Sequence, residues 1–129
     1  GGWLTAVRGD DGAFAGTLTD ITAGRAYWVL TNSFESIKVT IPRLSSGAAM
    51  LPPTVNIVEG WNFVPVLDVT GAKVYGNTIT SASYFANLTL SRVYTFNTIG
   101  NVWEDKTGGS VVVGTGYWVY ATKAGTLVP

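Results

Sequence analysis

The sequence has no cysteine and no histidine among its 129 residues. Disulfide bonds, thiol chemistry and Cys/His zinc sites are therefore excluded. Acid–base catalysis near neutral pH would need an aspartate, glutamate or lysine with a strongly shifted pKa. Charged residues make up only 12% of the chain, and eight basic residues balance eight acidic ones. Because the chain has no excess of basic residues to bind a phosphate backbone, we expect no nucleic acid partner.

Long apolar runs and helical periodicity are missing as well. The longest apolar runs are about five residues, far short of the ~20 that a membrane helix needs, so we expect no membrane insertion. Five Trp, six Tyr and five Phe supply large side chains for a core. Short β-rich runs alternate with turns rich in Gly, Asn, Asp, Ser and Pro. This pattern predicts an all-β fold, a β-sandwich or flattened barrel, with a helical turn expected only over residues 81–88.

One short motif occurs twice, as Tyr27-Trp28-Val29 and as Tyr117-Trp118-Val119. Aligning the two predicts one domain, residues 1–129, built from one and a half copies of a duplicated module. Residues 1–43 form the half repeat, residues 44–53 a linker and residues 54–129 the full repeat. The half repeat lacks the front part of the module.

The repeated motif also predicts which side chains face inward. Strand alternation puts Tyr117 and Val119 on one face and Trp118 and Tyr120 on the other. We expect both Tyr-Trp-Val segments to be equivalent interior strands. Trp28, Trp61 and Trp118 are accordingly expected in the core.

Two longer motifs together resemble a known type of module. Gly-Trp-Asn at residues 60–62 and Gly-Tyr-Trp-Val-Tyr at residues 116–120 resemble a β-module repeated in large extracellular proteins of bacteria and archaea. Such modules belong to surface-layer and cell-wall-associated chains, and the pattern extends to phage structural proteins. The first copy departs from it at Ala26 and Leu30, where the second has Gly116 and Tyr120. The resemblance implies an architecture and a surface setting, and it brings no catalytic residues.

The candidate contact residues are aromatic side chains beside turns. Trp3, Trp103, Tyr94 and Tyr75 could form a flat platform for stacking a carbohydrate, or they could belong to the core. A second candidate is the adhesion tripeptide Arg8-Gly9-Asp10, for which an ordinary hairpin turn is the favoured interpretation.

No constellation of residues points to catalysis. The carboxylates are scattered or adjacent, and no serine sits in a nucleophile elbow. We therefore expect no enzyme, no catalytic residue, no metal site and no cofactor. The sequence predicts a non-catalytic structural or adhesive module of a larger surface or virion protein, located extracellularly, at the cell surface or in the virion. Its expected partners are neighbouring modules or other surface or virion proteins. The alternative is a carbohydrate- or receptor-binding module, with a glycan as partner.

Overall fold

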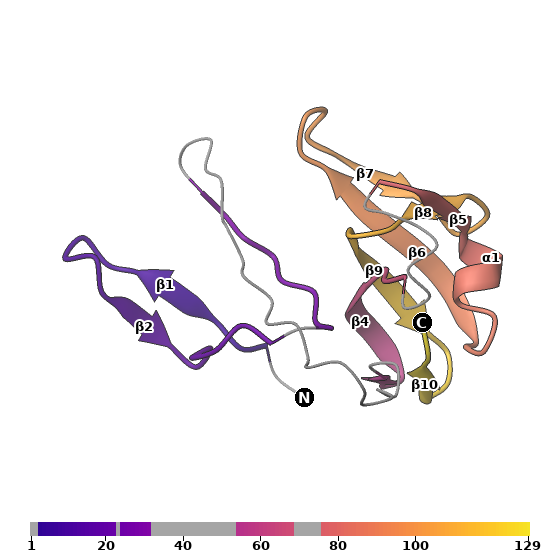
Figure 1. Ribbon diagram of the computed structural model, residues 1–129, viewed down its shortest axis with the longest axis horizontal. Coiled ribbons are helices and arrows are strands. Elements are labelled where there is room, and N and C mark those ends of the chain that lie inside the picture. Colours follow the sequence, from indigo (N-terminus) through magenta and orange to yellow (C-terminus); the bar gives the residue numbers. More distant parts are fainter. Residues whose placement is uncertain (1–2, 23, 32–53, 69–75) are drawn as a thin grey trace, which may run out of the picture.

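The computed structural model describes residues 3–22, 24–31, 54–68 and 76–129 (Figure 1). The predicted all-β class is confirmed, since the described residues form ten strands and one short helix. In chain order these elements are β1 (Ala6–Arg8), β2 (Phe14–Gly16), β3 (Val55–Ile57), β4 (Gly60–Pro65), β5 (Thr78–Thr80), α1 (Ser81–Tyr84), β6 (Leu90–Asn97), β7 (Val102–Asp105), β8 (Ser110–Val112), β9 (Gly116–Ala121) and β10 (Gly125–Leu127).

An antiparallel sheet of four strands, in the order β4-β9-β6-β7, organises the fold. The pairs β10-β3 and β5-β8 form two smaller sheets, and β1-β2 is a separate hairpin. No barrel closes among the described strands, so the arrangement is sandwich-like. β9 is a central strand, because β4 and β6 pair with its two edges.

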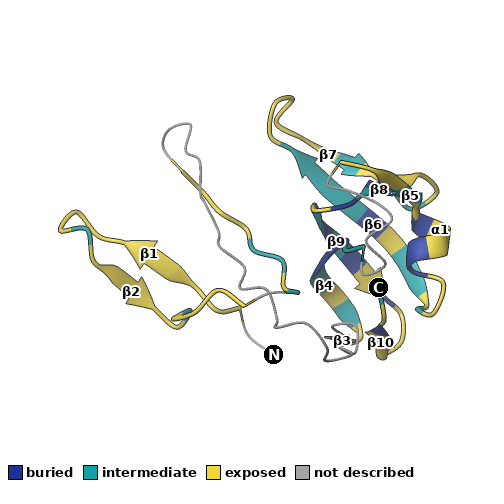
Figure 2. Ribbon diagram, in the orientation of Figure 1, coloured by how far each residue is buried: buried dark blue, intermediate teal, exposed yellow. Residues whose placement is uncertain are grey.

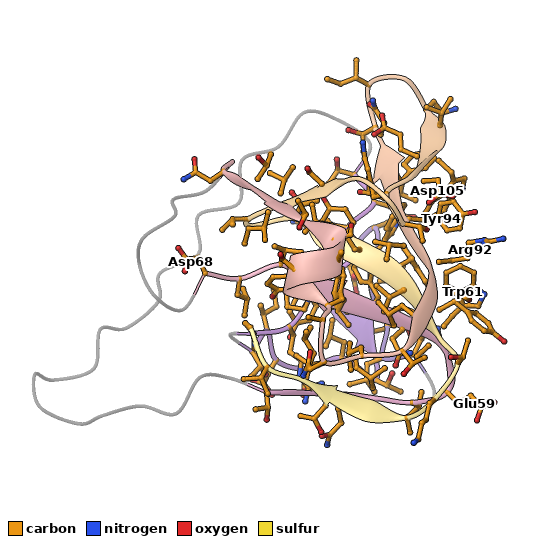
Figure 3. The ribbon with its side chains drawn as sticks, turned by 90° about the vertical axis from the view of Figure 1, so that its right-hand side faces the viewer. Glu59, Trp61, Asp68, Arg92, Tyr94 and Asp105 are labelled. Carbon is orange, nitrogen blue, oxygen red and sulfur yellow. The ribbon has the colours of Figure 1, made fainter. Side chains whose placement is uncertain are left out.

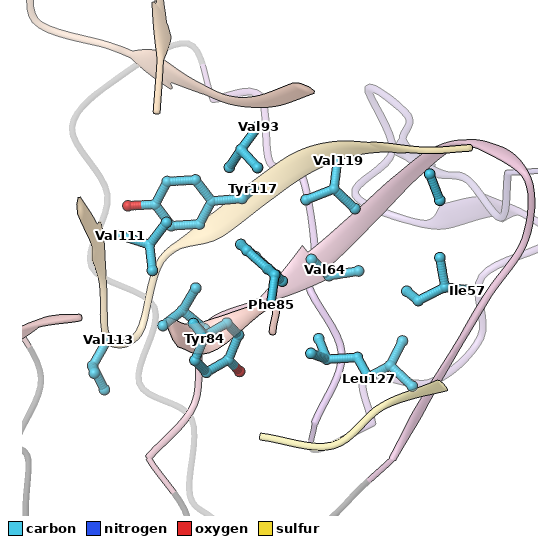
Figure 4. Close-up of a cluster of buried hydrophobic side chains, with 13 residues drawn as sticks. Ile57, Val64, Tyr84, Phe85, Val93, Val111, Val113, Tyr117, Val119 and Leu127 are labelled. Carbon is cyan, nitrogen blue, oxygen red and sulfur yellow. The ribbon is translucent and has the colours of Figure 1, made fainter. Parts of the chain in front are cut away.

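The hydrophobic core lies on one face of the four-stranded sheet (Figures 2 and 4). Tyr117 and Val119 of β9 point into it and are 1% and 0% exposed. Trp118 and Tyr120 occupy the opposite face, as strand alternation predicts. The other buried core residues come mainly from β3, β4, α1, β6, β8 and β10: Val55, Ile57, Val64, Val66, Tyr84, Phe85, Val93, Val111, Val113, Ala121 and Leu127.

The predicted helical turn within residues 81–88 is confirmed as α1. Thr80 caps its N-terminus, since its side chain accepts a hydrogen bond from the backbone N–H of Ser83. Ser81 is buried and holds the helix to the turn after β7, donating from its N–H to Gly109 O and from its hydroxyl to Lys106 O. The helix thereby presents Tyr84 to the core.

The β1-β2 hairpin shares one kind of hydrogen bond with the β6-β7 hairpin. The Thr17 hydroxyl accepts a hydrogen bond from Thr5 N, at 3.1 Å. In β6-β7 the Thr107 hydroxyl accepts from Val93 N, at 2.9 Å. In both hairpins a threonine after the second strand thus closes the hairpin onto the first strand.

The prediction that the two Tyr-Trp-Val segments are equivalent interior strands is wrong for the described part of the first repeat. Residues 117–119 lie in β9, but residues 25–31 belong to no strand, and Trp28 is 50% exposed. The physical reason lies in the sheet partners. β9 is held between β4 and β6, whereas no described strand pairs with residues 25–31. The rest of the half repeat, residues 32–43, and the predicted linker, residues 44–53, lie outside the described residues.

Candidate binding face

The face of the four-stranded sheet opposite the core is covered with aromatic rings. Strand register sets them in rows: Trp61 of β4 lies opposite Tyr120, Phe63 opposite Trp118, and Trp103 of β7 opposite Phe96. Tyr94 of β6 lies across from Trp118 on the other edge of β9. We call this surface the outer aromatic face, formed by Trp61, Phe63, Tyr94, Phe96, Trp103, Trp118 and Tyr120.

The Gly-Trp-Asn motif builds one edge of this face. Gly60 has a φ of 99°, a backbone conformation that favours glycine. The Asn62 side chain ties the β3-β4 turn together: its Oδ1 accepts from Val58 N at 3.0 Å, and its Nδ2 donates to Val58 O at 2.8 Å and to Gly60 O at 3.0 Å. Trp61, between them, points outward and is 49% exposed. The motif therefore holds a tryptophan at the edge of the face.

The Gly-Tyr-Trp-Val-Tyr motif builds the centre of the face. Gly116 leaves room for the ring of Phe63, because a Cβ at residue 116 would stand 2.5 Å from Phe63 Cζ. On the core side, the Tyr117 hydroxyl accepts a hydrogen bond from Val112 N at 2.8 Å. Burial raises the pKa of Tyr117 above its ordinary value, so the phenol remains neutral. Trp118 is thereby fixed in the middle of the face.

Two tryptophans from the N-terminal segment, residues 3–31, pack on the outer aromatic face. The ring of Trp3 lies 4.8 Å from that of Trp118, centroid to centroid. Trp28 stacks on Trp103 at 5.9 Å with 23° between the planes, and it also lies 5.6 Å from Phe96. These separations are those of favourable aromatic pairs, worth about 0.5–1.5 kcal/mol each beyond the area they bury. The outer aromatic face thus receives aromatic side chains from a distant part of the chain.

A groove remains open on the same face. It has a volume of about 390 Å³ and is lined by Trp61, Tyr94, Trp103 and Trp118. Trp118 Nε1 is buried and has no hydrogen-bond partner among the described residues. A buried donor left unsatisfied costs about 1–3 kcal/mol. Because this nitrogen is buried, it adds no polar surface to the groove, whose lining is aromatic.

The rim of the groove carries two opposite charges. Arg92 and Asp105 lie on the same face of the sheet as Tyr94, Arg92 two residues before it on β6 and Asp105 opposite it on β7. Figure 3 shows them with Trp61 and Tyr94 along one side of the molecule, whereas Asp68 lies on the other. Hydrogen bonds from Thr107 lower the pKa of Asp105, and the charge of Arg92 lowers it further, so Asp105 is ionised at neutral pH.

The sequence-predicted contact residues are partly brought together. Tyr94 and Trp103 line the groove, and Trp3 packs against Trp118 beside it. Tyr75 lies outside the described residues. Trp61 and Trp118 were expected in the core but line the groove, so that expectation is wrong for them; Trp118 is half-buried and Trp61 exposed. Strand alternation puts Trp118 on the face opposite Tyr117 and Val119, but it does not indicate which of the two faces is buried.

The tripeptide Arg8-Gly9-Asp10 lies at the end of β1 and in the turn that leads to β2. Gly12 N donates to Gly9 O at 2.9 Å, and Asp11 Oδ1 accepts from Ala13 N at 3.0 Å. Gly12 has a φ of 80°. The hairpin turn expected for this stretch is therefore confirmed, and the tripeptide is exposed at its tip.

The acidic side chains of the described residues form no cluster that could hold a metal ion. No group of three or more His, Cys, Asp or Glu residues that could hold a metal ion occurs in that part of the chain. Glu104 forms an ion pair with Lys106 at 2.8 Å, and hydrogen bonds from Lys106 and Asn97 lower the pKa of Glu104.

Within the described ranges, no helix has the length and apolar character to span a membrane.

Comparison of the chain with family models, with curated proteins and with solved structures gave no match in any of the three. The assignment of function therefore depends on the geometry of the outer aromatic face.

Proposed function

We propose that this chain is a non-catalytic structural module of a larger surface or virion protein, and that it docks neighbouring modules through its outer aromatic face. The observation that carries the proposal is the packing of Trp3 against Trp118 and of Trp28 against Trp103. Residues of one repeat thereby pack against the sheet of the next. The setting at a cell surface, outside the cell or in a virion follows from the resemblance of the two motifs to extracellular repeat modules.

Exposure of the N-terminal segment supports a docking role. Its apolar side chains include Leu4, Val7, Phe14 and Ile21, which are 62–73% exposed. The register puts Val7 and Phe14 on opposite faces of the β1-β2 hairpin, so both faces expose apolar side chains, as is typical of an element that meets another protein. An isolated two-stranded hairpin is marginally stable in water, so β1-β2 gains order by attachment to a folded neighbour. The partners that fit are neighbouring modules of the same polypeptide or other surface or virion proteins.

The balanced charge of the chain and its aromatic surface support a structural role without catalysis. The chain has no net charge at neutral pH. Packing of apolar rings is non-directional and tolerates repeated use between similar modules. The module would therefore act through shape and ring packing, and we propose no catalytic residue, metal or cofactor for it.

Limited proteolysis tests the docking. Arg25, an exposed trypsin site, lies three residues before Trp28. If Trp3 and Trp28 anchor the segment, the double variant Trp3→Ala/Trp28→Ala is cut at Arg25 several times faster than the wild type. The control is Ile99→Ala, which removes a side chain that is 98% exposed in the β6-β7 turn and leaves the rate unchanged. Equal cleavage rates for all three proteins would contradict docking of the segment.

The proposed location has its own test. An antibody against the chain should label intact, unpermeabilised cells or intact particles of the source. Labelling that appears only after permeabilisation would contradict the surface or virion setting and would leave the docking result unaffected.

A further inference from the structure

The groove on the outer aromatic face has the composition of a sugar-binding subsite. Aromatic rings from all four strands of the sheet form its walls: Trp61 from β4, Trp118 from β9, Tyr94 from β6 and Trp103 from β7. Trp61 and Tyr94 lie 6.1 Å apart, with 40° between their planes. Trp61 is 49% and Trp103 55% exposed, so ring surface is available to a ligand. Its volume, about 390 Å³, is within the range of small-molecule sites.

We propose that this groove binds a neutral oligosaccharide of pyranose rings whose hydroxyl groups are equatorial. Such a ring has axial C–H groups on both faces and hydroxyl groups around its edge. Its faces are therefore apolar and flat enough to stack on an indole, while its edge both donates and accepts hydrogen bonds.

The polar groups at the rim of the groove favour a hydroxylated ligand over a purely apolar one. At the rim, Arg92 supplies donors and the carboxylate of Asp105 supplies acceptors, and both lie on the same face as the groove. An aromatic wall with a polar rim matches the faces and edge of a pyranose.

Charge favours a neutral ligand. The two charged side chains of the rim, Arg92 and Asp105, have opposite signs, and the charge of Arg92 acts on the carboxyl of Asp105. A phosphate or uronic acid would gain from Arg92 and be repelled by Asp105. An uncharged sugar hydrogen-bonds to both without such a penalty.

The contact of Trp3 with Trp118 shows that this face accepts flat rings. Trp3 lies 4.8 Å from Trp118, with 37° between the rings, yet it does not line the groove. Docking of the N-terminal segment and binding of a sugar therefore use neighbouring parts of one face. The sugar site goes beyond the docking role and does not depend on it.

Titration by NMR tests the proposal on the whole chain. The five tryptophans give five indole N–H signals, so the ring that responds is identified directly. Cellopentaose and chitopentaose serve as probes at concentrations up to about 5 mM, which detects millimolar dissociation constants. We expect saturable shifts of the Trp61, Trp103 and Trp118 signals, because a sugar stacked on these rings changes the surroundings of all three indoles.

Two variants and a dilution series make the test decisive. Trp61→Ala should weaken binding by at least about tenfold, which corresponds to about 1.4 kcal/mol. Phe14→Ala, on the exposed β2 strand, should leave the affinity unchanged. The proposal is overturned if neither saccharide shifts the groove signals, or if Trp61→Ala binds as well as the wild type. Shifts that follow protein concentration without any sugar would assign the groove to a second copy of the chain and would also overturn it.

Discussion

The ring of Phe63 lies over Gly116, so closely that a Cβ on residue 116 would stand 2.5 Å from Phe63 Cζ. The two residues are diagonal neighbours, two places apart in the register, since Gly116 pairs with Pro65 and Phe63 with Trp118. The absence of a side chain at residue 116 therefore lets a ring on β4 pack across β9. The first repeat carries Ala26 at the matching position, within a segment that belongs to no strand.

Gly116→Ala should lower the free energy of unfolding by about 1–3 kcal/mol, because the new methyl group displaces Phe63 from its position against Trp118. Urea unfolding followed by tryptophan fluorescence measures the change. Gly108→Ala is the matched control, since a Cβ there meets nothing within 4 Å. It should stay within about 0.5 kcal/mol of the wild type. Equal stability of the two variants would show that Phe63 does not depend on Gly116.

Asn62 should matter for stability through its side-chain amide, which makes three hydrogen bonds within the β3-β4 turn. Asn62→Ala should destabilise the chain by about 0.5–1.5 kcal/mol, because the turn loses its side-chain hydrogen bonds, and water can replace those at the exposed Val58. Thermal unfolding checks this. Asn56→Ala, an exposed position on the neighbouring β3, should have little effect. If Asn62→Ala unfolds at the wild-type temperature, the amide has no structural role in the motif.

Stability should fall at high pH because of two core phenols. Burial raises the pKa of Tyr84 and Tyr117 above 10.0 in the folded chain. The unfolded chain therefore loses these protons first as the pH rises, and stability present below pH 10 declines above it. Urea midpoints between pH 8 and 11 measure the decline. Tyr84→Phe should flatten it, and an unchanged slope in that variant would contradict the account.

Stability should also fall at low pH, because of two carboxylates on β7. Hydrogen bonds lower the pKa of Glu104 and Asp105 below their ordinary values of 4.5 and 3.8. Their contribution is present above those values and is lost as both become protonated on acidification. Stability is thus expected to be greatest between about pH 5 and 9.

Much of the fold could be predicted from local pattern. The alternation of Tyr117, Trp118 and Val119 gave the two faces of β9 correctly, and the turn at Asp11-Gly12 and the helical turn after Thr80 were also found. These features depend on short-range chemistry: strand period, positive φ at glycine and capping by a hydroxyl.

Which face of β9 is the core could not be read from aromatic content. Both faces carry large rings, so the tryptophans were assigned to the interior when valines fill much of it instead. Val64, Val93 and Val119 are at most 2% exposed, whereas Trp61 is 49% exposed. Only strand pairing shows that Tyr117 shares its face with these small side chains. The sequence did identify Tyr94 and Trp103 as contact candidates, because both stand near a turn.

The first repeat shows the limit of sequence similarity. Tyr27-Trp28-Val29 has the same three residues as the segment 117–119 of β9, but it belongs to no strand. A strand also needs neighbouring strands that pair with its edges. Side chains keep part of their role: Trp28 still packs among aromatic rings, now on the surface of the other repeat.

The docking of the first repeat on the outer aromatic face is tested most directly by a double-mutant cycle between Trp28 and Trp103. The unfolding free energies of Trp28→Ala, Trp103→Ala, the double variant and the wild type give the coupling between the two rings. Stacked at 5.9 Å, they should show a coupling of about 0.5–1.5 kcal/mol. Strictly additive effects would mean that the rings do not meet in solution and would contradict the docking of the two repeats.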